Sequence, residues 1–315
     1  MNIAEALASR RDPFFSFELT PPERGAGIED VHRAVEVLKP YRPLFIDVTN
    51  HAADSWFEEG PDGTFNRHIT RKRPGTLGLC AAIKWRHDVE TVPHLLCHGF
   101  TCEETEDALI ELSFLGIRNL LAVRGDQTDW RAVRPGARNE HAVDIVRQVV
   151  EMNAGRYLHR MTGASATDFC VGVAGYPEKH FEAPSAAYDL QHLKAKVDAG
   201  AAYVITQMFF DNAAYFDFTA RCRAAGIGVP IIPGLKVVGR KGLLTNIPRH
   251  FHVDLPDALV DAILHASGPQ EAAEAGVAHA LSQARGLLDG GAPGVHFFVY
   301  NDAPLAGRVL EQLGL

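Results

Sequence analysis

The chain has 315 residues, of which 46% are hydrophobic and 22% charged, so it carries ample material for a large buried core. Asp and Glu outnumber Lys and Arg, giving a formal net charge of −8. A mildly acidic chain without basic runs argues against nucleic acid or an anionic membrane as its main partner. No run of about 18 apolar residues predicts a membrane span, and the first residues lack a secretory signal. The five cysteines form no CxxC pair, which is typical of reduced thiols in a cytoplasmic protein.

Short apolar runs rich in Val, Ile and Phe alternate with longer amphipathic stretches along the whole chain. Such near-continuous apolarity favours strands that are buried on both faces of a parallel sheet. The expected strands are residues 14–19, 44–49, 89–96, 117–123, 169–175, 203–208, 229–235 and 295–300.

The segments between these strands have recognisable helix ends. Thr101 is followed three residues later by Glu104, which predicts a capping box, and Gly116 ends that helix. Ser185 is expected to cap a later helix, which Gly200 stops. Eight strands, each followed by a helical pattern, predict an α/β fold: a single (β/α)8 TIM barrel spanning residues 1–315 as one domain.

Two segments depart from this simple alternation. Residues 240–290 are longer than one crossover needs, so we expect extra helices beside the barrel before the last strand. Residues 128–140 are polar and contain Pro and Gly, which predicts a mobile loop.

Polar side chains stand at the carboxyl ends of nearly all the expected strands, which is where barrels of this kind carry their chemistry. They are Glu18, Thr49, His94, the run Arg124-Gly125-Asp126, Tyr176 with His180, Gln207, and Asn301. The seventh strand ends in Pro233-Gly234, which brings backbone to the rim. An amide that ends an apolar strand, as at Gln207, must find partners, which slightly favours binding over structure. The pattern predicts a broad, ligand-lined mouth.

These residues also have structural interpretations. Glu18 is either a surface carboxylate that closes an aromatic strand or, in an apolar setting, a general acid with a raised pKa. Arg124 and Asp126 flank a glycine, so a structural ion pair between them is equally open. A lone histidine such as His94 or His180 is more often a satisfied core or loop residue than a functional one.

Several common motifs are absent. There is no GxGxxG fingerprint of a Rossmann fold and no GxSxG elbow of a serine hydrolase. Residues 234–241 come near a P-loop, but Arg240 stands in place of its lysine and the Ser or Thr is missing, so we reject that site. No compact metal-binding spacing appears, and we predict no metal site.

The strand-end segments resemble methylenetetrahydrofolate reductases, in the same order along the chain. The segments are SFELTPP (16–22), VPHLLCHGFT (92–101), GIRNLLAVRGD (116–126), VAGYPEKHFEAPS (173–185), LKAKVDAGAAYVITQMFFDN (193–212), VPIIPGL (229–235) and HFFVYN (296–301). The resemblance covers essentially the whole chain and is to the bacterial type, with the catalytic barrel only.

This resemblance implies a flavin-dependent oxidoreductase of one-carbon metabolism and methionine biosynthesis. FAD would lie at the carboxyl ends of the strands and take a hydride from NAD(P)H, which then leaves. Methylenetetrahydrofolate would bind on the same flavin face and be reduced to methyltetrahydrofolate, in a ping-pong reaction whose redox step belongs to the cofactor. The implied partners are these small molecules, and a homo-oligomer is common in the family.

Three positions match the family's catalytic residues. Glu18 matches the glutamate proposed to protonate the folate as its imidazolidine ring opens. Asp126 matches the aspartate that favours the cationic iminium intermediate. Gln207 matches the glutamine that contacts folate and nicotinamide in turn. Glu18 and Gln207 are therefore also expected to bind substrate, and so is Lys241, which falls near the place of an aromatic that packs on substrate in the family.

A larger group of positions matches the family's flavin-contacting residues. They are Thr49, His94, Arg124, Gly125, Asp126, Ala142, Tyr176, His180, Asp189 and Lys196. The chain departs from the family pattern at His141, His192, Ala195 and Lys241. Two alternatives stay open: a reductase of this family with weak or no flavin or with a protein electron donor, and a non-catalytic barrel that binds folate or flavin.

Overall fold

The computed structural model describes residues 1–126, 136–299 and 302–314. Within them, eight parallel strands close into a barrel in the order β1-β10-β9-β8-β7-β6-β5-β2. These strands are β1 (Phe14–Leu19), β2 (Ile46–Val48), β5 (Thr91–Leu96), β6 (Asn119–Val123), β7 (Cys170–Gly175), β8 (Tyr203–Met208), β9 (Ile231–Leu235) and β10 (Gly294–Phe298). Each overlaps one expected apolar run, and the (β/α)8 barrel is confirmed. Asn301 and most of the 128–140 segment lie outside the described residues.

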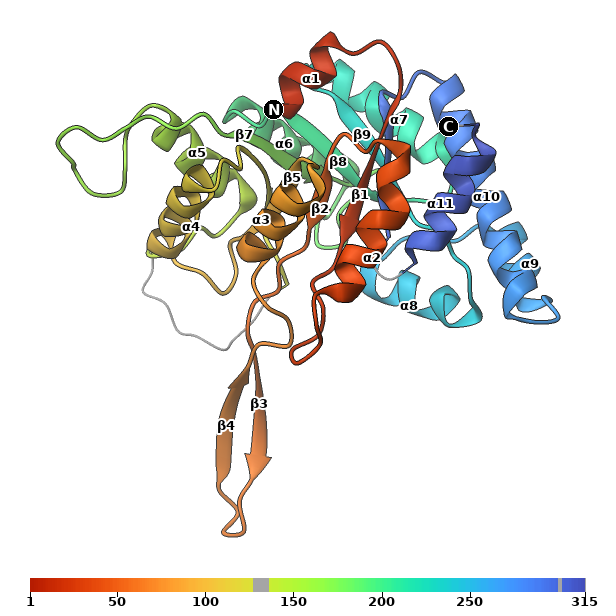
Figure 1. Cartoon of the computed structure of the whole chain (residues 1–315), viewed down its shortest axis with the longest axis horizontal. Helices are drawn as coiled ribbons and strands as arrows, with labels where there is room; N and C mark the ends of the chain where they lie inside the picture. Colours follow the sequence, from red (N-terminus) through yellow and green to blue (C-terminus); the bar gives the residue numbers. More distant parts are fainter. Residues whose placement is uncertain (127–135, 300–301, 315) are drawn as a thin grey trace.

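Helices surround the barrel on its outer side (Figure 1). They are α2 (Glu29–Leu38), η1 (Lys39–Tyr41), α3 (Thr76–His87), α4 (Cys102–Phe114), α5 (Ala142–Asn153), α6 (Ala186–Asp198), α7 (Asn212–Ala224), α8 (Lys241–Phe251), α9 (Asp257–Leu264), α10 (Pro269–Asp289) and α11 (Ala303–Gln312). The expected extra helices before the last strand are α8 and α9. No helix in the described part of the chain has both the length and the apolarity needed to cross a membrane.

Both predicted helix caps are present. The Thr101 hydroxyl accepts a hydrogen bond from the Glu104 backbone N–H at 3.1 Å, and the Glu104 carboxylate accepts one from the Thr101 backbone N–H at 2.8 Å. The Ser185 hydroxyl accepts from the Tyr188 backbone N–H at 3.2 Å. These bonds satisfy backbone donors that a helix start leaves unpaired, so α4 and α6 begin at fixed points just after β5 and β7.

The amino end of the barrel is filled with apolar side chains and closed by α1 (Ile3–Ser9). Ile3 packs among the inward-facing residues of the strands, including Phe14, Phe45 and Tyr203, and is fully buried. Asn119 fixes this plug, because its side-chain oxygen accepts from the Ile3 backbone N–H at 2.9 Å. In Figure 1, α1 lies at the upper end of the barrel. Among the described residues, the amino end of the barrel axis is therefore closed to ligands.

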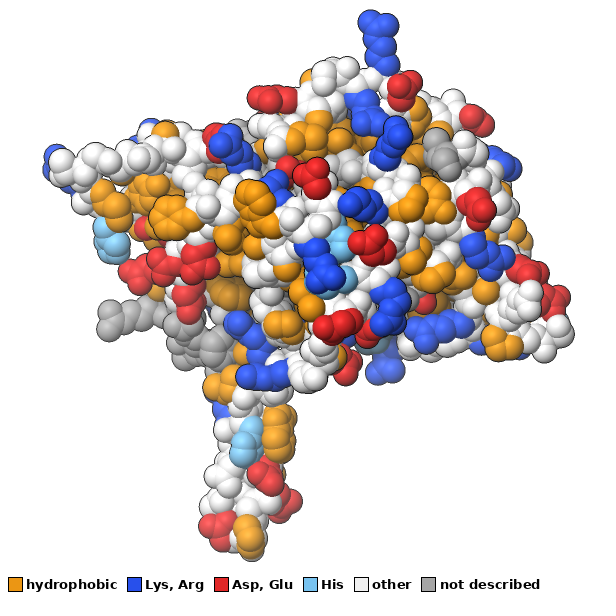
Figure 2. Space-filling view, viewed as in Figure 1, with side chains coloured by type: hydrophobic (Ala, Val, Ile, Leu, Met, Phe, Trp, Pro, Cys, Tyr) orange, Lys and Arg blue, Asp and Glu red, His pale blue; other side chains and the backbone are white. Residues whose placement is uncertain are grey.

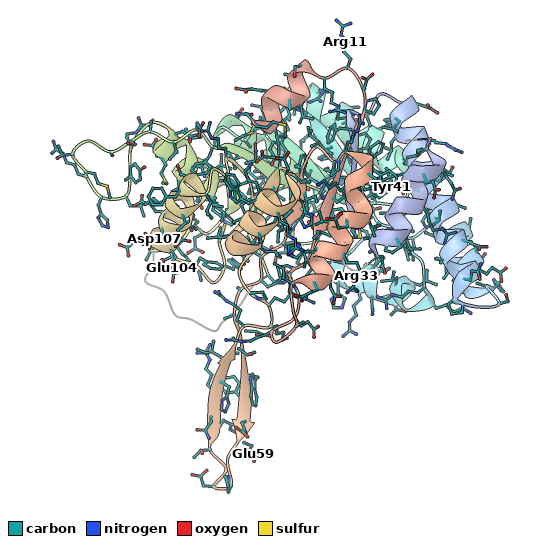
Figure 3. The ribbon with its side chains drawn as sticks, viewed as in Figure 1. Arg11, Arg33, Tyr41, Glu59, Glu104 and Asp107 are labelled. Carbon is teal, nitrogen blue, oxygen red and sulfur yellow. The ribbon has the colours of Figure 1, made fainter. Side chains whose placement is uncertain are left out.

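A two-stranded antiparallel hairpin, β3 (Asp54–Glu59) and β4 (Phe65–Thr70), was not predicted. It extends from the carboxyl end of the barrel, well clear of the body (Figure 1), and Glu59 lies near its far end (Figure 3). Its hydrophobic side chains are visible from outside (Figure 2), with Phe57 62% exposed. The overlooked signal is the Asp62-Gly63 turn, in which Gly63 adopts a left-handed φ of 77°.

Packing inside the barrel predicts opposite effects for two glycine substitutions. Gly172→Ala should lower the free energy of unfolding by about 1–3 kcal/mol, because its Cβ would lie 2.3 Å from the buried Tyr203 ring. Gly78→Ala adds the same methyl group to α3 with no atom within 4 Å, and should raise that free energy by about 0.5–1 kcal/mol. Urea denaturation measures both. Equal changes in the free energy of unfolding for the two variants would show that the barrel interior around Gly172 is not tightly packed.

Candidate functional site

Two cavities adjoin each other at the carboxyl end of the barrel. The first, called here the central cavity, has a volume of about 440 Å³ and lies over the barrel axis. Its lining includes the predicted residues Glu18, Thr49, His94, Gly125, Asp126 and Gln207. The second, called here the flanking cavity, has a volume of about 310 Å³ and lies beside α5 and α6. Its lining includes the predicted residues Arg124, Ala142, Tyr176, His180, Asp189 and Lys196. Val123 lines both.

The structure thus brings together twelve of the predicted site residues and leaves one apart. Lys241 begins α8, is exposed, and donates through Nζ to the Leu264 carbonyl at 2.8 Å. It lines neither cavity. Of the departures from the family pattern, His141 and His192 line the flanking cavity, whereas Ala195 does not.

Glu18 lies on the floor of the central cavity and is only 6% exposed. Its neighbours Phe15 and Phe17 point to the other face of β1, where both rings stack on Phe297. The alternation of a strand therefore turns Glu18 inward. Burial removes water from its carboxyl group and raises its pKa to about 7. Glu18 is not a surface carboxylate, and it can hold a proton near neutral pH.

His94 lies between two buried carboxyl groups. Its Nε2 is 3.6 Å from Glu18 Oε2 and 3.4 Å from Asp47 Oδ2. Desolvation lowers the pKa of His94, against the opposing charge of Glu18, and raises the pKa of the fully buried Asp47 well above its usual value. Sequence reasoning missed Asp47. Its signal was an ionisable residue within an apolar run expected to be buried on both faces.

A second layer of polar groups lies below this cluster and beside it. His296 on β10 is fully buried, and its Nδ1 is 2.8 Å from the Ser16 hydroxyl. Burial lowers its pKa to about 3, so its ring is neutral. Lys236, just after β9, is 4% exposed and donates to Asp302 Oδ2 at 3.2 Å. Burial lowers the pKa of Lys236. Both residues were missed, although each is an ionisable residue in or directly after an apolar run.

The wall of the central cavity combines a glycine turn with polar side chains. Gly125 has a left-handed φ of 79°, and a Cβ there would meet Leu96 at 3.3 Å. A glycine is thus required where the chain turns over the cavity. The Thr49 hydroxyl lies 3.1 Å from His51 Nε2. Gln207 accepts the Met208 backbone N–H on its side-chain oxygen at 2.9 Å, so its NH2 group is the part that can donate to a ligand.

The flanking cavity is lined by cationic and hydrogen-bonding groups. Arg124 Nη1 donates to Glu182 Oε2 at 2.5 Å, so the ion pair of Arg124 is with Glu182 rather than with Asp126. Lys196 Nζ donates to the Ala174 carbonyl at 2.6 Å, and burial lowers its pKa to about 8. Asp189 accepts the His180 backbone N–H at 3.0 Å.

These donors suit a ligand with phosphate groups. Guanidinium and ammonium groups form charge-assisted hydrogen bonds with phosphate oxygens, and Arg124 and Lys196 supply one of each. Among the described residues, no group of His, Cys, Asp and Glu is arranged to hold a metal ion.

The environment of Glu18 predicts how its removal changes stability with pH. The folded protein keeps Glu18 protonated up to about pH 7, whereas an unfolded chain loses that proton near its ordinary pKa of 4.5. As the pH rises from about 4.5 to about 7, the free energy of unfolding of the wild type therefore falls relative to that of Glu18→Gln. At about 1.4 kcal/mol per pH unit, the advantage of the variant should grow by roughly 3 kcal/mol.

Urea unfolding of both proteins at about pH 5 and about pH 8 measures this difference. An advantage of Glu18→Gln that is equal at both pH values would show that the Glu18 carboxyl is not desolvated.

Comparisons with known proteins agree with the resemblance of the motifs. The chain matches the family model described as "Methylenetetrahydrofolate reductase" over residues 3–314. It is 30% identical over 306 residues to "Methylenetetrahydrofolate reductase 1" of Schizosaccharomyces pombe, covering 96% of this chain and 46% of that protein. It is also 30% identical over 306 residues to the "5,10-methylenetetrahydrofolate reductase" of Escherichia coli, covering 95% and 90%. The chain thus spans less than half the length of the S. pombe protein and most of the E. coli one.

A solved structure shares the fold. It is an uncharacterized protein from Clostridium thermocellum whose description says that it binds two copies of 5-methyl-5,6,7,8-tetrahydrofolic acid. The TM-score is 0.59 at 13% sequence identity, and the match covers 99% of each chain. This likeness supports the barrel architecture.

Proposed function

The chain belongs to the methylenetetrahydrofolate reductase family, and on that premise we propose that it reduces methylenetetrahydrofolate to methyltetrahydrofolate with NAD(P)H, through bound FAD, in the cytoplasm. The observation that carries the proposal is Glu18. A buried carboxyl whose pKa is about 7 lies on the floor of a cavity at the carboxyl ends of the strands. An acid with this pKa is half protonated near neutral pH and suits general acid catalysis.

The residues of the two cavities fit FAD. Arg124 and Lys196 would hold its phosphates in the flanking cavity, and Asp189 would accept from a ribose hydroxyl. Gly125, with no side chain, would let the flavin ring approach the turn after β6. When bound, FAD supplies the hydride-transfer chemistry, while the chain orients the reactants and tunes their charge.

Three side chains of the central cavity would act on the folate. Glu18 gives its proton to the substrate nitrogen as the imidazolidine ring opens. Asp126, at the rim, stabilises the positive charge of the resulting iminium electrostatically. Gln207 orients the substrate through its NH2 group, and the same group would contact the nicotinamide in the other half-reaction. The compound named for the C. thermocellum barrel is the product proposed here.

Glu18→Gln tests this assignment by separating the two half-reactions. The variant should bind FAD and be reduced by NAD(P)H at nearly the wild-type rate, because neither step needs the Glu18 proton. Reoxidation by methylenetetrahydrofolate should slow by about 100-fold or more, since general acid catalysis contributes about 10²–10⁴. Anaerobic stopped-flow absorbance follows each half-reaction. Wild-type reoxidation by the variant would remove Glu18 from the role of proton donor.

Two lysines on α6 provide a matched test of the cofactor site. Lys196 is half-buried and lines the flanking cavity, whereas the equally half-buried Lys194 lies outside that cavity and pairs with Asp198. Lys196→Met should weaken FAD binding by about 10- to 100-fold, the value of a hydrogen bond to a charged group. Lys194→Met should leave it unchanged. Flavin fluorescence titration of cofactor-free protein gives both dissociation constants. Equal binding by the two variants would place the phosphates elsewhere.

A further inference from the structure

Asp47 lies next to the proposed proton donor, on the neighbouring strand of the barrel. It is fully buried and does not line the central cavity, so it touches none of the proposed reactants. On the barrel wall it is the register neighbour of Glu18, since the Cα atoms of the two residues pair between β1 and β2. An ionisable group in such a place is costly to bury, and the proposed reaction gives it no task.

Both carboxyl groups approach the same atom of His94. Asp47 Oδ2 is 3.4 Å from Nε2 and within hydrogen-bond reach, whereas Glu18 Oε2 is 3.6 Å away and just outside it. One ring nitrogen carries at most one hydrogen and, when deprotonated, accepts along one direction. Asp47 and Glu18 therefore compete for Nε2, and Asp47 is the nearer.

The groups that face Asp47 offer it no other strong partner. They are Glu18 on β1, Cys80 on α3, His94 on β5 and Tyr203 on β8, with the neutral His296 on β10 next to His94. Lys236, after β9, faces Glu18 instead. Asp47 Oδ1 has no hydrogen-bond partner in the described part of the chain. A buried carboxylate with one unsatisfied oxygen is unfavourable, so Asp47 is favoured as the neutral acid.

We propose that Asp47 is a positioning residue: as a neutral acid it donates its O–H to His94 Nε2 and so prevents that imidazole from taking the proton of Glu18. With Nε2 occupied as an acceptor, His94 stays neutral, and no Glu18–imidazolium ion pair forms. Without the Asp47 donor, the ion pair becomes available and Glu18 is ionised at lower pH. The catalytic importance of Asp47 rests on the proposed role of Glu18 as proton donor. The test of the contact between Asp47 and His94 does not depend on that role.

Two substitutions of Asp47 by residues of similar size separate the effect of its hydrogen-bond donor from the effect of its charge. Asp47→Asn keeps a donor to Nε2 in the form of an NH2 group, whereas Asp47→Leu removes it and leaves an apolar side chain. Asp47→Asn should therefore leave the titration of Glu18 within experimental error of wild type. Asp47→Leu should move that titration to lower pH by about one unit, the size typical of a new charged partner. Glu106→Gln, which removes a buried carboxylate from α4, is the control for a remote loss of charge.

The titration can be read without turnover. Carbon-13 NMR of the full-length protein labelled at the glutamate side-chain carboxyls shows the Glu18 signal, which is identified by its loss in Glu18→Gln. The double variant Asp47→Leu/His94→Gln should return the titration toward wild type, because no imidazole is left to take the proton. In the same variants, the high-pH limb of the folate half-reaction should follow the NMR titration.

Two results would overturn the proposal. If Asp47→Asn and Asp47→Leu both leave the Glu18 titration in place, Asp47 does not act on Glu18. If both shift it equally, the charge of Asp47 matters and its donor does not. Because the NMR titration needs neither flavin nor folate, a protein without reductase activity would still test the role of Asp47. An unchanged titration in an active reductase would leave the proposed function standing.

Discussion

Desolvation of one carboxyl group is the constraint on which the site depends. The barrel is closed below by α1 and filled with apolar side chains, so Glu18 on its floor is separated from bulk water on every side except the cavity. Its pKa near neutrality follows from that burial more than from any charged neighbour. The polar cluster of Asp47, His94 and His296 is tolerated because each group has a neutral form that burial favours. The apolar side chains that close the amino end of the barrel thus create the desolvated environment in which the ionisable groups below the cavity stay neutral.

The two cavities divide the work that the proposed reaction needs. The flanking cavity gathers cations and hydrogen-bonding groups from β6, α5 and α6, and it suits the phosphates of a nucleotide cofactor. The central cavity gathers the titratable groups above the barrel axis. Both open at the carboxyl ends of the strands and share Val123, so a cofactor held in one can present its reactive ring in the other. Parallel strands place all these groups at one end, whatever their separation in the chain.

Much of this could be predicted from sequence, for local reasons. Continuous apolarity marks buried parallel strands, and caps such as Thr101 mark the starts of helices. The barrel and the residues at its carboxyl end could therefore be predicted. The hairpin was missed because its strands are largely polar and exposed, and they carry little of the burial pattern on which strand prediction relies. The pairing of Arg124 with Glu182 and the meeting of Asp47 with His94 depend on closure of the barrel. The spacing of residues along the sequence does not show which strands become neighbours when the barrel closes, so these contacts could not be predicted.

In the proposed reaction, FAD links a nicotinamide nucleotide to a folate above Glu18. An absorption spectrum of the purified protein, recorded anaerobically before and after NADH and then after methylenetetrahydrofolate, tests it most directly. We expect a flavin band that bleaches with the nucleotide and returns with the folate. Absence of a flavin band even after FAD is added would contradict it and favour a family reductase with another electron source. A band that bleaches but does not return with the folate would contradict folate reduction.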